Sequence, residues 1–282
     1  ILKVFNIKEE KKIIDLQDRA VTHIKKNYSS AAVPSSVDHK EITINGEIYH
    51  FKIQEFLEGD FLHKAEMSIN DYSGMGKFIG NLSKALTGFD HKAAHRVFDW
   101  DCSQTSIIKR NLSFVQNRKK RKTILYFVNK YEETVTPYLK ELRMSVIHND
   151  ANHHNILKNR IQKCYGIIDF GDMVFSYQVI EPAVAIAYIY LSSNDPLGRI
   201  FSFLRGYNSS FTLEPIELKV ITYFMCMRIC STATMSAWRK KLFPKNKYLT
   251  ISEKPAWSAL EKLSKVNLNN LSLDILKNVK KN

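Results

Sequence analysis

The sequence predicts an α+β protein with a small β-rich first lobe and a larger, mostly helical second lobe. In the run 41–54, two β-rich segments flank Asn45-Gly46, a pair preferred in tight hairpin turns that need positive φ. Through most of the remaining chain, apolar residues recur at helical spacing. Two short apolar runs, 145–147 and 165–168, read as strands, and each leads into an aspartate-containing loop. Strands gathered early with helices after them are typical of the α+β class.

The first lobe is predicted to span residues 1–57 and to hold a strand, a helix and the hairpin. Residues 1–5 alternate in polarity as a strand does, and residues 9–26 have helical spacing. The apolar face of this helix is formed by Ile13, Leu16, Ala20, Val21 and Ile24. After the hairpin, residues 55–60 break the strand pattern, and we expect the chain to cross into the second lobe there.

The second lobe is predicted to span residues 58–282. Its expected helices cover roughly residues 73–88, 106–117, 122–141 and several segments after Glu181. Glu181-Pro182 begins a helix well, because proline suits the first turn and a carboxylate complements the helix dipole. Glu181 is therefore interpreted as structural, with a substrate role as the alternative. The uninterrupted apolar run 183–191 predicts a buried core helix.

The composition is that of an ordinary globular protein, with 44% hydrophobic and 25% charged residues. Since no apolar run reaches about 18 residues, we expect no transmembrane helix and no membrane partner. The first residues lack the pattern of a secretion signal. The four cysteines form no C-x-x-C pair. Cys226 and Cys230 are one helical turn apart without accompanying histidines, so they are interpreted as buried thiols rather than as a metal site. These features favour a cytoplasmic location.

The formal net charge of +14 raises the question of a nucleic-acid partner. The positive charge is spread out, with local clusters at 8–12, 118–122 and 277–281, and the central cluster carries no interleaved aromatic residues. We therefore interpret the excess charge as a solvated basic surface and do not expect nucleic-acid binding.

The two aspartate-containing loops carry the strongest chemical signal. The first reads His148-x-Asp150-x-x-x-x-Asn155, and the second reads Asp169-Phe-Gly, nineteen positions after Asp150. Phosphoryl transfer from a nucleotide needs a carboxylate that accepts the proton of the attacking hydroxyl, and oxygen ligands that hold Mg²⁺ against the phosphates. Asp150 suits the first task, while Asn155 and Asp169 suit the second. Two turn-capping aspartates are the weaker alternative, because both motifs occur in the right order after strands.

These residues resemble the aminoglycoside phosphotransferase and choline kinase branch of the protein-kinase-like superfamily. The segments 166–174, 181–188 and 244–257 look like the hydroxylysine kinase group within that branch. The same kinase domain also occurs in bacteria fused to a class III aminotransferase-like domain, so the resemblance allows a fused domain outside this chain. The resemblance covers nearly the whole chain, most clearly after residue 75. It implies a two-lobed kinase-like fold, Mg²⁺ as cofactor, and ATP or GTP as phosphoryl donor.

The resemblance also implies a nucleotide site in the first lobe. Lys3 matches the strand lysine that grips the nucleotide phosphates, and the backbone of Glu55, Phe56 and Leu57 would meet the adenine or guanine ring. The helix glutamate that usually pairs with the lysine is absent: Gln17 stands in its place, with Asp15 as another candidate. The glycine-rich phosphate loop that precedes the lysine in the superfamily is also missing. We expect the chain to be a fragment of a longer polypeptide, and an absent nucleotide lid is the alternative.

Other side chains lie near the motifs or are available for the acceptor. His148 is expected to orient the metal loop, and His153 and His154 are not expected to bind zinc. Asp172 is expected either to support the metal loop or to face the substrate. For the acceptor, aromatic faces are available at Trp238, Tyr248 and Trp257, and Arg239 or Lys240 could meet a carboxylate.

We therefore expect transfer of the γ-phosphoryl group to the hydroxyl of a small amine-containing metabolite, with 5-hydroxylysine as the best candidate. An aminoglycoside, another amino alcohol or homoserine is the alternative acceptor. A non-catalytic kinase-like binding module is the alternative from a different class.

Overall fold

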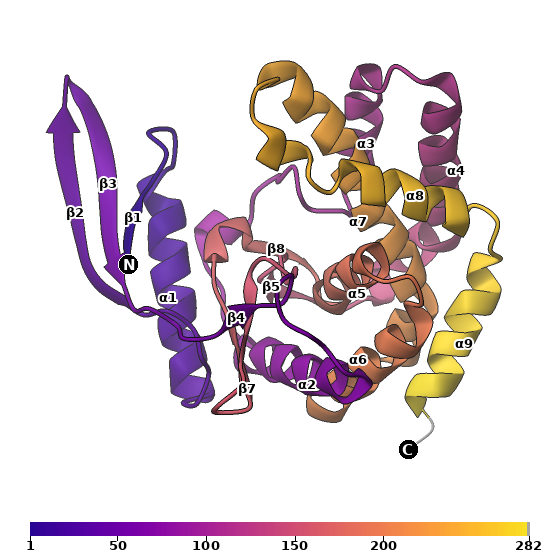
Figure 1. Cartoon of the computed structure of the whole chain (residues 1–282), viewed down its shortest axis with the longest axis horizontal. Helices are drawn as coiled ribbons and strands as arrows, with labels where there is room; N and C mark the ends of the chain where they lie inside the picture. Colours follow the sequence, from indigo (N-terminus) through magenta and orange to yellow (C-terminus); the bar gives the residue numbers. More distant parts are fainter. Residues whose placement is uncertain (281–282) are drawn as a thin grey trace.

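The computed structural model describes residues 1–280 and consists of a small sheet with one helix beside a larger helical body (Figure 1). Lys281, which belongs to the last basic cluster, lies outside the described residues. The α+β architecture predicted from the sequence is confirmed. The lobe boundary between residues 57 and 58 stays a prediction.

The first sheet consists of short antiparallel strands in the order β1-β3-β2. Its strands are β1 (Leu2–Val4), β2 (Ser36–Ile44) and β3 (Glu47–Gln54). The hairpin prediction is confirmed, because Asn45 and Gly46 form the turn with φ angles of 51° and 81°. Strand β2 begins at Ser36, earlier than the expected residue 41. Nearly all of its side chains are exposed, so its sequence shows no inside–outside alternation.

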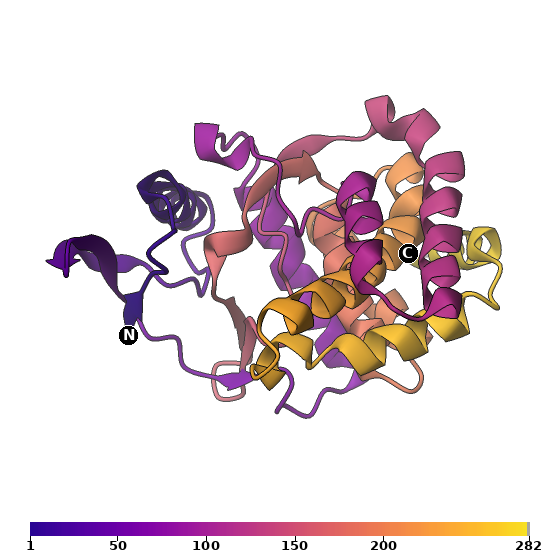
Figure 2. The same ribbon diagram turned by 90° about the horizontal axis from the view of Figure 1, so that it is seen from above.

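Helix α1 (Lys11–Asn27) joins the first lobe to the helical body. Its apolar side is buried and belongs to the same hydrophobic core as α2 (Ile69–Ala85). Two lysines in its last turn, Lys25 and Lys26, complement the negative end of the helix dipole. Figure 2 shows this helix lying between the first sheet and the rest of the chain.

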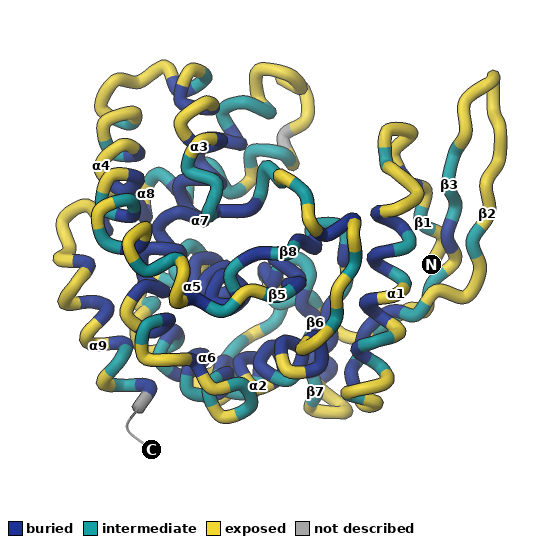
Figure 3. Tube along the Cα trace, turned by 180° about the vertical axis from the view of Figure 1, so that it is seen from behind, coloured by how far each residue is buried: buried dark blue, intermediate teal, exposed yellow. Residues whose placement is uncertain are grey.

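The helical body is built around a long buried helix. Its helices are α2, α3 (Thr105–Asn111), α4 (Arg118–Thr134), α5 (Ile180–Ser192), α6 (Leu197–Ser210), α7 (Pro215–Leu242), α8 (Glu253–Leu263) and α9 (Leu268–Lys280). Helices α5 and α7 carry long buried stretches at the centre of the body, as the dark segments in Figure 3 show. The predicted buried helix at 183–191 is thus confirmed. Within residues 1–280, no helix is both long and apolar enough to span a membrane.

Several helix boundaries differ from the expected ones because local capping overrides periodicity. Helix α2 starts early, since Ser68 and Asp71 form a reciprocal capping box. Helix α4 starts after Asn117, whose side chain accepts a hydrogen bond from the Lys120 amide at 3.0 Å. It ends at Thr134, and the following segment with Pro137 continues as a 3₁₀ helix, Thr136–Glu141.

Short antiparallel strands hold the two motif loops. Strand β5 (Met144–Ile147) pairs with β8 (Val174–Tyr177), and a second sheet has the order β4-β6-β7. Its strands are β4 (Asp60–Phe61), β6 (Ile156–Asn159) and β7 (Cys164–Ile167). The sequence predicted β5 and β7 but not their partners, which are too short to show a pattern. These pairings place the loop after β5 next to the loop after β7.

Candidate active site

A pocket of about 260 Å³ lies where the two motif loops face helices α5 and α7. Its floor contains both predicted aspartates, Asp150 and Asp169, together with Asn155. Its other lining residues are Trp100, Asn152, His154, Asp172, Tyr188, Arg228, Thr232, Ser236, Arg239, Tyr248, Leu249, Ile251 and Ser252.

The loop after β7 presents Asp169 in a left-handed conformation, with φ 64° and ψ 76°. Its Oδ1 atom accepts a hydrogen bond from Lys3 Nζ at 2.9 Å, and about half of the Asp169 side chain stays exposed. Burial opposes ionisation of this carboxyl, but the charge and hydrogen bond of Lys3 outweigh burial and lower the pKa of Asp169. The site therefore keeps Asp169 charged.

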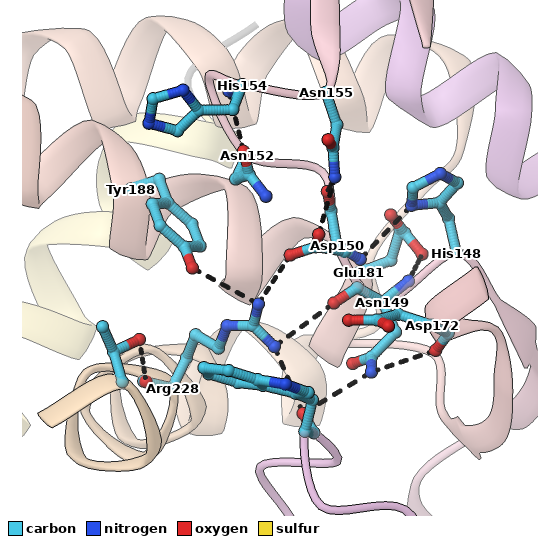
Figure 4. Close-up of polar contacts among 12 residues, drawn as sticks. His148, Asn149, Asp150, Asn152, His154, Asn155, Asp172, Glu181, Tyr188 and Arg228 are labelled. Atoms are coloured by element: carbon cyan, nitrogen blue, oxygen red, sulfur yellow. Dashed lines mark hydrogen bonds and ion pairs between the residues drawn. The ribbon is translucent and has the colours of Figure 1, made fainter. Parts of the chain in front are cut away.

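Asp150 is held from two sides. Its Oδ1 atom accepts a hydrogen bond from Arg228 Nη2 at 2.7 Å, and its Oδ2 atom accepts one from Asn155 Nδ2 at 2.6 Å. Burial raises the pKa of Asp150, whereas the positive charge of Arg228 lowers it. The carboxylate is thus fixed in position and close to a compensating charge (Figure 4).

Arg228 stands in the middle of α7 and is 1% exposed. Its guanidinium also donates to the carbonyl oxygens of Trp100 at 3.2 Å and Asn149 at 3.4 Å, and to the Tyr188 hydroxyl at 3.4 Å. It lies over the Trp100 ring, 4.9 Å from the centroid. A buried charge needs such partners, and here they come from both the motif loop and the helices.

Two further buried groups support the loop after β5. His148 accepts a hydrogen bond from the Asp150 amide through Nδ1, and its Nε2 donates to the Ile168 carbonyl, so it joins the two motif loops. Burial lowers the pKa of His148 to about 4.

Glu181 Oε2 accepts a hydrogen bond from the amide of Asn149, which has a φ of 66°. Burial raises the pKa of Glu181 to about 7. The His148 and Glu181 side chains both hydrogen-bond to the backbone of the loop, in agreement with a structural role.

The structure brings Lys3, Asp150, Asn155 and Asp169 into one region, although Lys3 and Asp169 are 166 positions apart. The predicted ring-binding segment lies between β3 and β4. There Glu55 forms an ion pair with Lys25 at 2.7 Å, and its hydrogen bond from Lys25 lowers its pKa.

The other two residues of this segment differ in exposure. Phe56 is 70% exposed, while Leu57 lies against Gly166 of β7. The nucleotide role of all three residues stays a prediction.

Neither candidate partner of Lys3 forms an ion pair with it. Asp15 instead pairs with Arg19 and His91, and its hydrogen bond from Arg19 lowers its pKa. Gln17 is buried and lines a small pocket together with Lys3 and Asp169. Lys52, which is opposite Lys3 across the sheet, pairs with Asp18 of α1 at 2.5 Å.

The sequence did not point to Arg228, Trp100 or Tyr188. For Arg228 a signal was present, since one arginine interrupts a long apolar stretch of α7 and charged residues are rarely fully buried without a partner. Of the aromatic candidates, Tyr248 lines the pocket. Trp257 lines a different pocket, where the Lys120 ammonium group lies over its ring.

The histidines of the loop cluster with a third one. His63 lies 4.4 Å from His154 and 6.3 Å from His153, measured between ring centroids. Over the described range 1–280, no group of three or more His, Cys, Asp or Glu side chains is arranged to hold a metal ion.

Comparisons with known proteins agree with the resemblance seen in the sequence. The mouse (Mus musculus) protein named hydroxylysine kinase is 27% identical over 228 residues, covering 76% of this chain and 61% of the mouse protein. The Xenopus laevis protein of the same name is 32% identical over 204 residues, covering 67% of this chain and 54% of that protein. The chain thus spans a little over half of the length of these relatives.

Solved structures confirm the kinase-like fold. An amicoumacin kinase in complex with AMP-PNP, Ca²⁺ and its ligand superimposes with a TM-score of 0.70 at 13% identity, covering 96% of this chain and 84% of that one. A microcompartment-associated aminopropanol kinase gives a TM-score of 0.64 at 17% identity, covering 98% and 87%. The model of the phosphotransferase enzyme family matches residues 1–213, and the chain belongs to this family.

Proposed function

We propose that this chain carries the catalytic centre of a small-molecule kinase that transfers the γ-phosphoryl group of ATP or GTP to a hydroxyl group. The observation that carries the proposal is the meeting of Asp150, Asn155 and Asp169 on one pocket floor, with Lys3 bound to Asp169. These are the groups that phosphoryl transfer requires: a carboxylate for the attacking hydroxyl, oxygen ligands and a cation for phosphate.

The side chains suit a magnesium ion. Both hydrogen bonds from Asn155 Nδ2 go to Asp150, at 2.6 Å and 3.1 Å, which leaves the amide oxygen of Asn155 available as a ligand. The half-exposed carboxylate of Asp169 is the second oxygen donor. Mg²⁺ prefers such hard ligands and usually completes its shell with water and phosphate oxygens. When bound, it would neutralise charge on the transferred phosphoryl group.

The remaining chemistry comes from the chain itself. Asp150 would accept a hydrogen bond from the acceptor hydroxyl and take its proton, while Arg228 and Asn155 keep the carboxylate in place. Lys3 would move from Asp169 to the phosphates once nucleotide binds. Since the reaction needs mainly positioning and charge neutralisation, small displacements of these groups should be costly.

For the acceptor we propose a small amine-containing metabolite, with 5-hydroxylysine first. Support comes from the relatives named hydroxylysine kinase and from the chemistry of the pocket, whose floor is rich in carboxylates. Homoserine, ethanolamine, choline and kanamycin are the acceptors to compare.

The test is release of nucleoside diphosphate with Mg²⁺, ATP or GTP, and each acceptor. We expect turnover with 5-hydroxylysine, and we expect Asp150→Asn and Asp169→Asn each to lose roughly a thousandfold in kcat, at about 1.4 kcal/mol per tenfold. The matched control is Asp274→Asn, which changes an exposed carboxylate on α9 and should retain parental activity. Near-parental turnover in Asp169→Asn would refute the assignment.

A further inference from the structure

Helix α7 carries one continuous polar stripe along the pocket wall. Arg228, Thr232, Ser236 and Arg239 all line the pocket, and their spacing of four, four and three residues places them on one face of the helix. The guanidinium of Arg228, at one end of the stripe, binds Asp150. The other end carries Arg239, which the catalytic assignment does not use.

Arg239 differs from Arg228 in that its charge is not compensated. Within the part of the chain that the structure describes, no carboxylate forms an ion pair with Arg239. Its guanidinium lies over the Trp100 ring, 5.0 Å from the centroid, and Arg228 lies 4.9 Å from the same centroid. The indole thus contacts both arginines and holds the Arg239 side chain at the pocket wall, which reduces the entropy lost when a ligand binds.

The two lysines that follow Arg239 on α7, Lys240 and Lys241, make their contacts outside this pocket. Lys240 pairs with Glu253 at 3.6 Å and lines a separate pocket, and Lys241 lies over Phe114. Lys3, the predicted phosphate-binding cation, does not line the Asp150 pocket but a smaller one beside Asp169. Arg239 therefore lines the Asp150 pocket without sharing a pocket with Lys3, which suits a contact with the acceptor rather than with the donor phosphates.

We propose that Arg239, stacked on Trp100, is the subsite for the carboxylate of an α-amino-acid acceptor whose hydroxyl lies at Asp150. This inference rests on the proposed function and deepens it. Guanidinium groups bind carboxylates through two parallel hydrogen bonds, which gives geometric selectivity as well as affinity. Asp172 is a third carboxylate lining the pocket, beside Asp150 and Asp169, and it has no ion-pair partner among residues 1–280. Burial raises the pKa of Asp172 to about 7, and a cationic amine of the same acceptor would favour its ionised form.

The subsite predicts discrimination between amino acids and their decarboxylated counterparts. Choline, ethanolamine and kanamycin carry cationic nitrogen groups but no carboxylate, so each would leave Arg239 unpaired in the pocket. A charge-assisted bidentate contact at a half-buried site should favour the carboxylate-bearing ligand by roughly ten- to a hundredfold.

Binding can be tested without catalysis, using the full chain with L-lysine and cadaverine. The two probes have the same terminal amine and differ by the carboxylate, and neither has the hydroxyl that would be phosphorylated. Calorimetry should show L-lysine binding the parent protein at least about tenfold more tightly than cadaverine. Arg239→Ala should abolish this preference, whereas Lys240→Ala should retain it. Equal binding of the two probes to the parent, or an unchanged preference in Arg239→Ala, would overturn the subsite.

Turnover then separates this inference from the proposed function. With 5-hydroxylysine as acceptor, Arg239→Ala should raise KM at least about tenfold and change kcat less, because the contact is far from the reacting oxygen. If no acceptor is phosphorylated but the lysine preference is present and depends on Arg239, the kinase assignment fails and the carboxylate subsite stands. If 5-hydroxylysine is turned over equally well by Arg239→Ala, the subsite is refuted and the kinase assignment stands. Thermal melting of Arg239→Ala and Lys240→Ala confirms that both variants fold.

Discussion

The ion pair between Arg228 and Asp150 is the most constrained contact of the site. The Arg228 side chain is 2% exposed and that of Asp150 18% exposed, so both charges depend on each other rather than on water. Breaking a buried pair by removing one partner is far more damaging than its net contribution suggests, because the remaining charge is left uncompensated. The pair therefore couples the fold of the body to the chemistry of the loop.

Replacing Arg228 with Met should expose this coupling through pH. Burial already raises the pKa of Asp150 and the guanidinium opposes that effect, so its loss should raise the pKa further. In the proposed reaction Asp150 must be ionised to accept the proton of the hydroxyl, so the acidic limb of the kcat profile should move to higher pH. Stability should fall by about 3–5 kcal/mol at neutral pH, and the loss should shrink as pH falls, because protonated Asp150 needs no partner.

Steady-state rates and urea unfolding, each measured across pH, check this expectation. Arg143→Met is the control. Arg143 forms an ion pair of 2.5 Å with the buried Glu217, and neither residue lines the pocket. It should lose stability but leave the acidic limb unchanged. An unshifted limb in Arg228→Met would mean that Arg228 is only structural.

At the residue level, the motif residues that meet in one pocket could be located from the sequence, whereas most of the side chains that hold them could not. The catalytic and metal roles of the motif residues stay predictions. Asp150, Asn155 and Asp169 belong to short local patterns in which the type and spacing of residues reflect the chemistry. Arg228 left a local signal, a charge within a long apolar stretch, but its partner depends on how α7 packs against the loop after β5. The position of Trp100 depends on the same packing and left no local pattern.

At the level of elements, helices α2 and α6 approach so closely that glycine is required at their contact. A Cβ atom on Gly206 would lie 1.9 Å from the Ser73 carbonyl oxygen, and one on Gly76 would lie 1.9 Å from the Phe203 carbonyl oxygen. Gly198, in the first turn of the same α6, has no atom closer than 4.0 Å to its Cβ position. The two glycines of α6 thus provide a matched comparison.

Gly206→Ala should destabilise the protein by about 3 kcal/mol or more, because backbone atoms rather than flexible side chains must move apart. Gly198→Ala should be neutral or stabilising by up to about 1 kcal/mol, since alanine restricts the unfolded chain. Urea unfolding of both variants measures the difference. Equal stability would show that the two helices can separate without cost.

Elements with a strong local signal could be predicted from the sequence, and those that depend on a distant partner could not. The hairpin turn at Asn45-Gly46 and the buried helix α5 follow from residue preferences and apolar content. Strands β4, β6 and β8 contain two to four residues each and exist because a partner strand pairs with them. Helix ends were displaced by capping side chains, which act over three residues and escape a periodicity argument.

At the level of the whole molecule, both apolar and polar contacts join the first lobe to the helical body. The apolar face of α1 belongs to the main hydrophobic core, and this burial supplies most of the cohesion. The ion pair between Lys3 and Asp169 is one polar link, and that between Asp15 and His91 is another; the Lys3 and Asp169 side chains are 32% and 53% exposed. Exposed pairs of this kind contribute at most about 1 kcal/mol to stability, so cohesion does not explain the contact.

Lys3→Met should therefore separate function from stability. We expect its unfolding free energy to stay within about 1 kcal/mol of the parent, whereas its KM for nucleotide should rise at least about tenfold through loss of the phosphate-binding cation. Lys109→Met is the matched control: it removes a comparably exposed pair with Glu132 (2.7 Å) on the far helices and should change neither quantity appreciably. Urea unfolding and nucleotide titration at saturating acceptor measure the two effects. If Lys3→Met lost several kcal/mol of stability with an unchanged KM, the lysine would be a link between the lobes and not a nucleotide ligand.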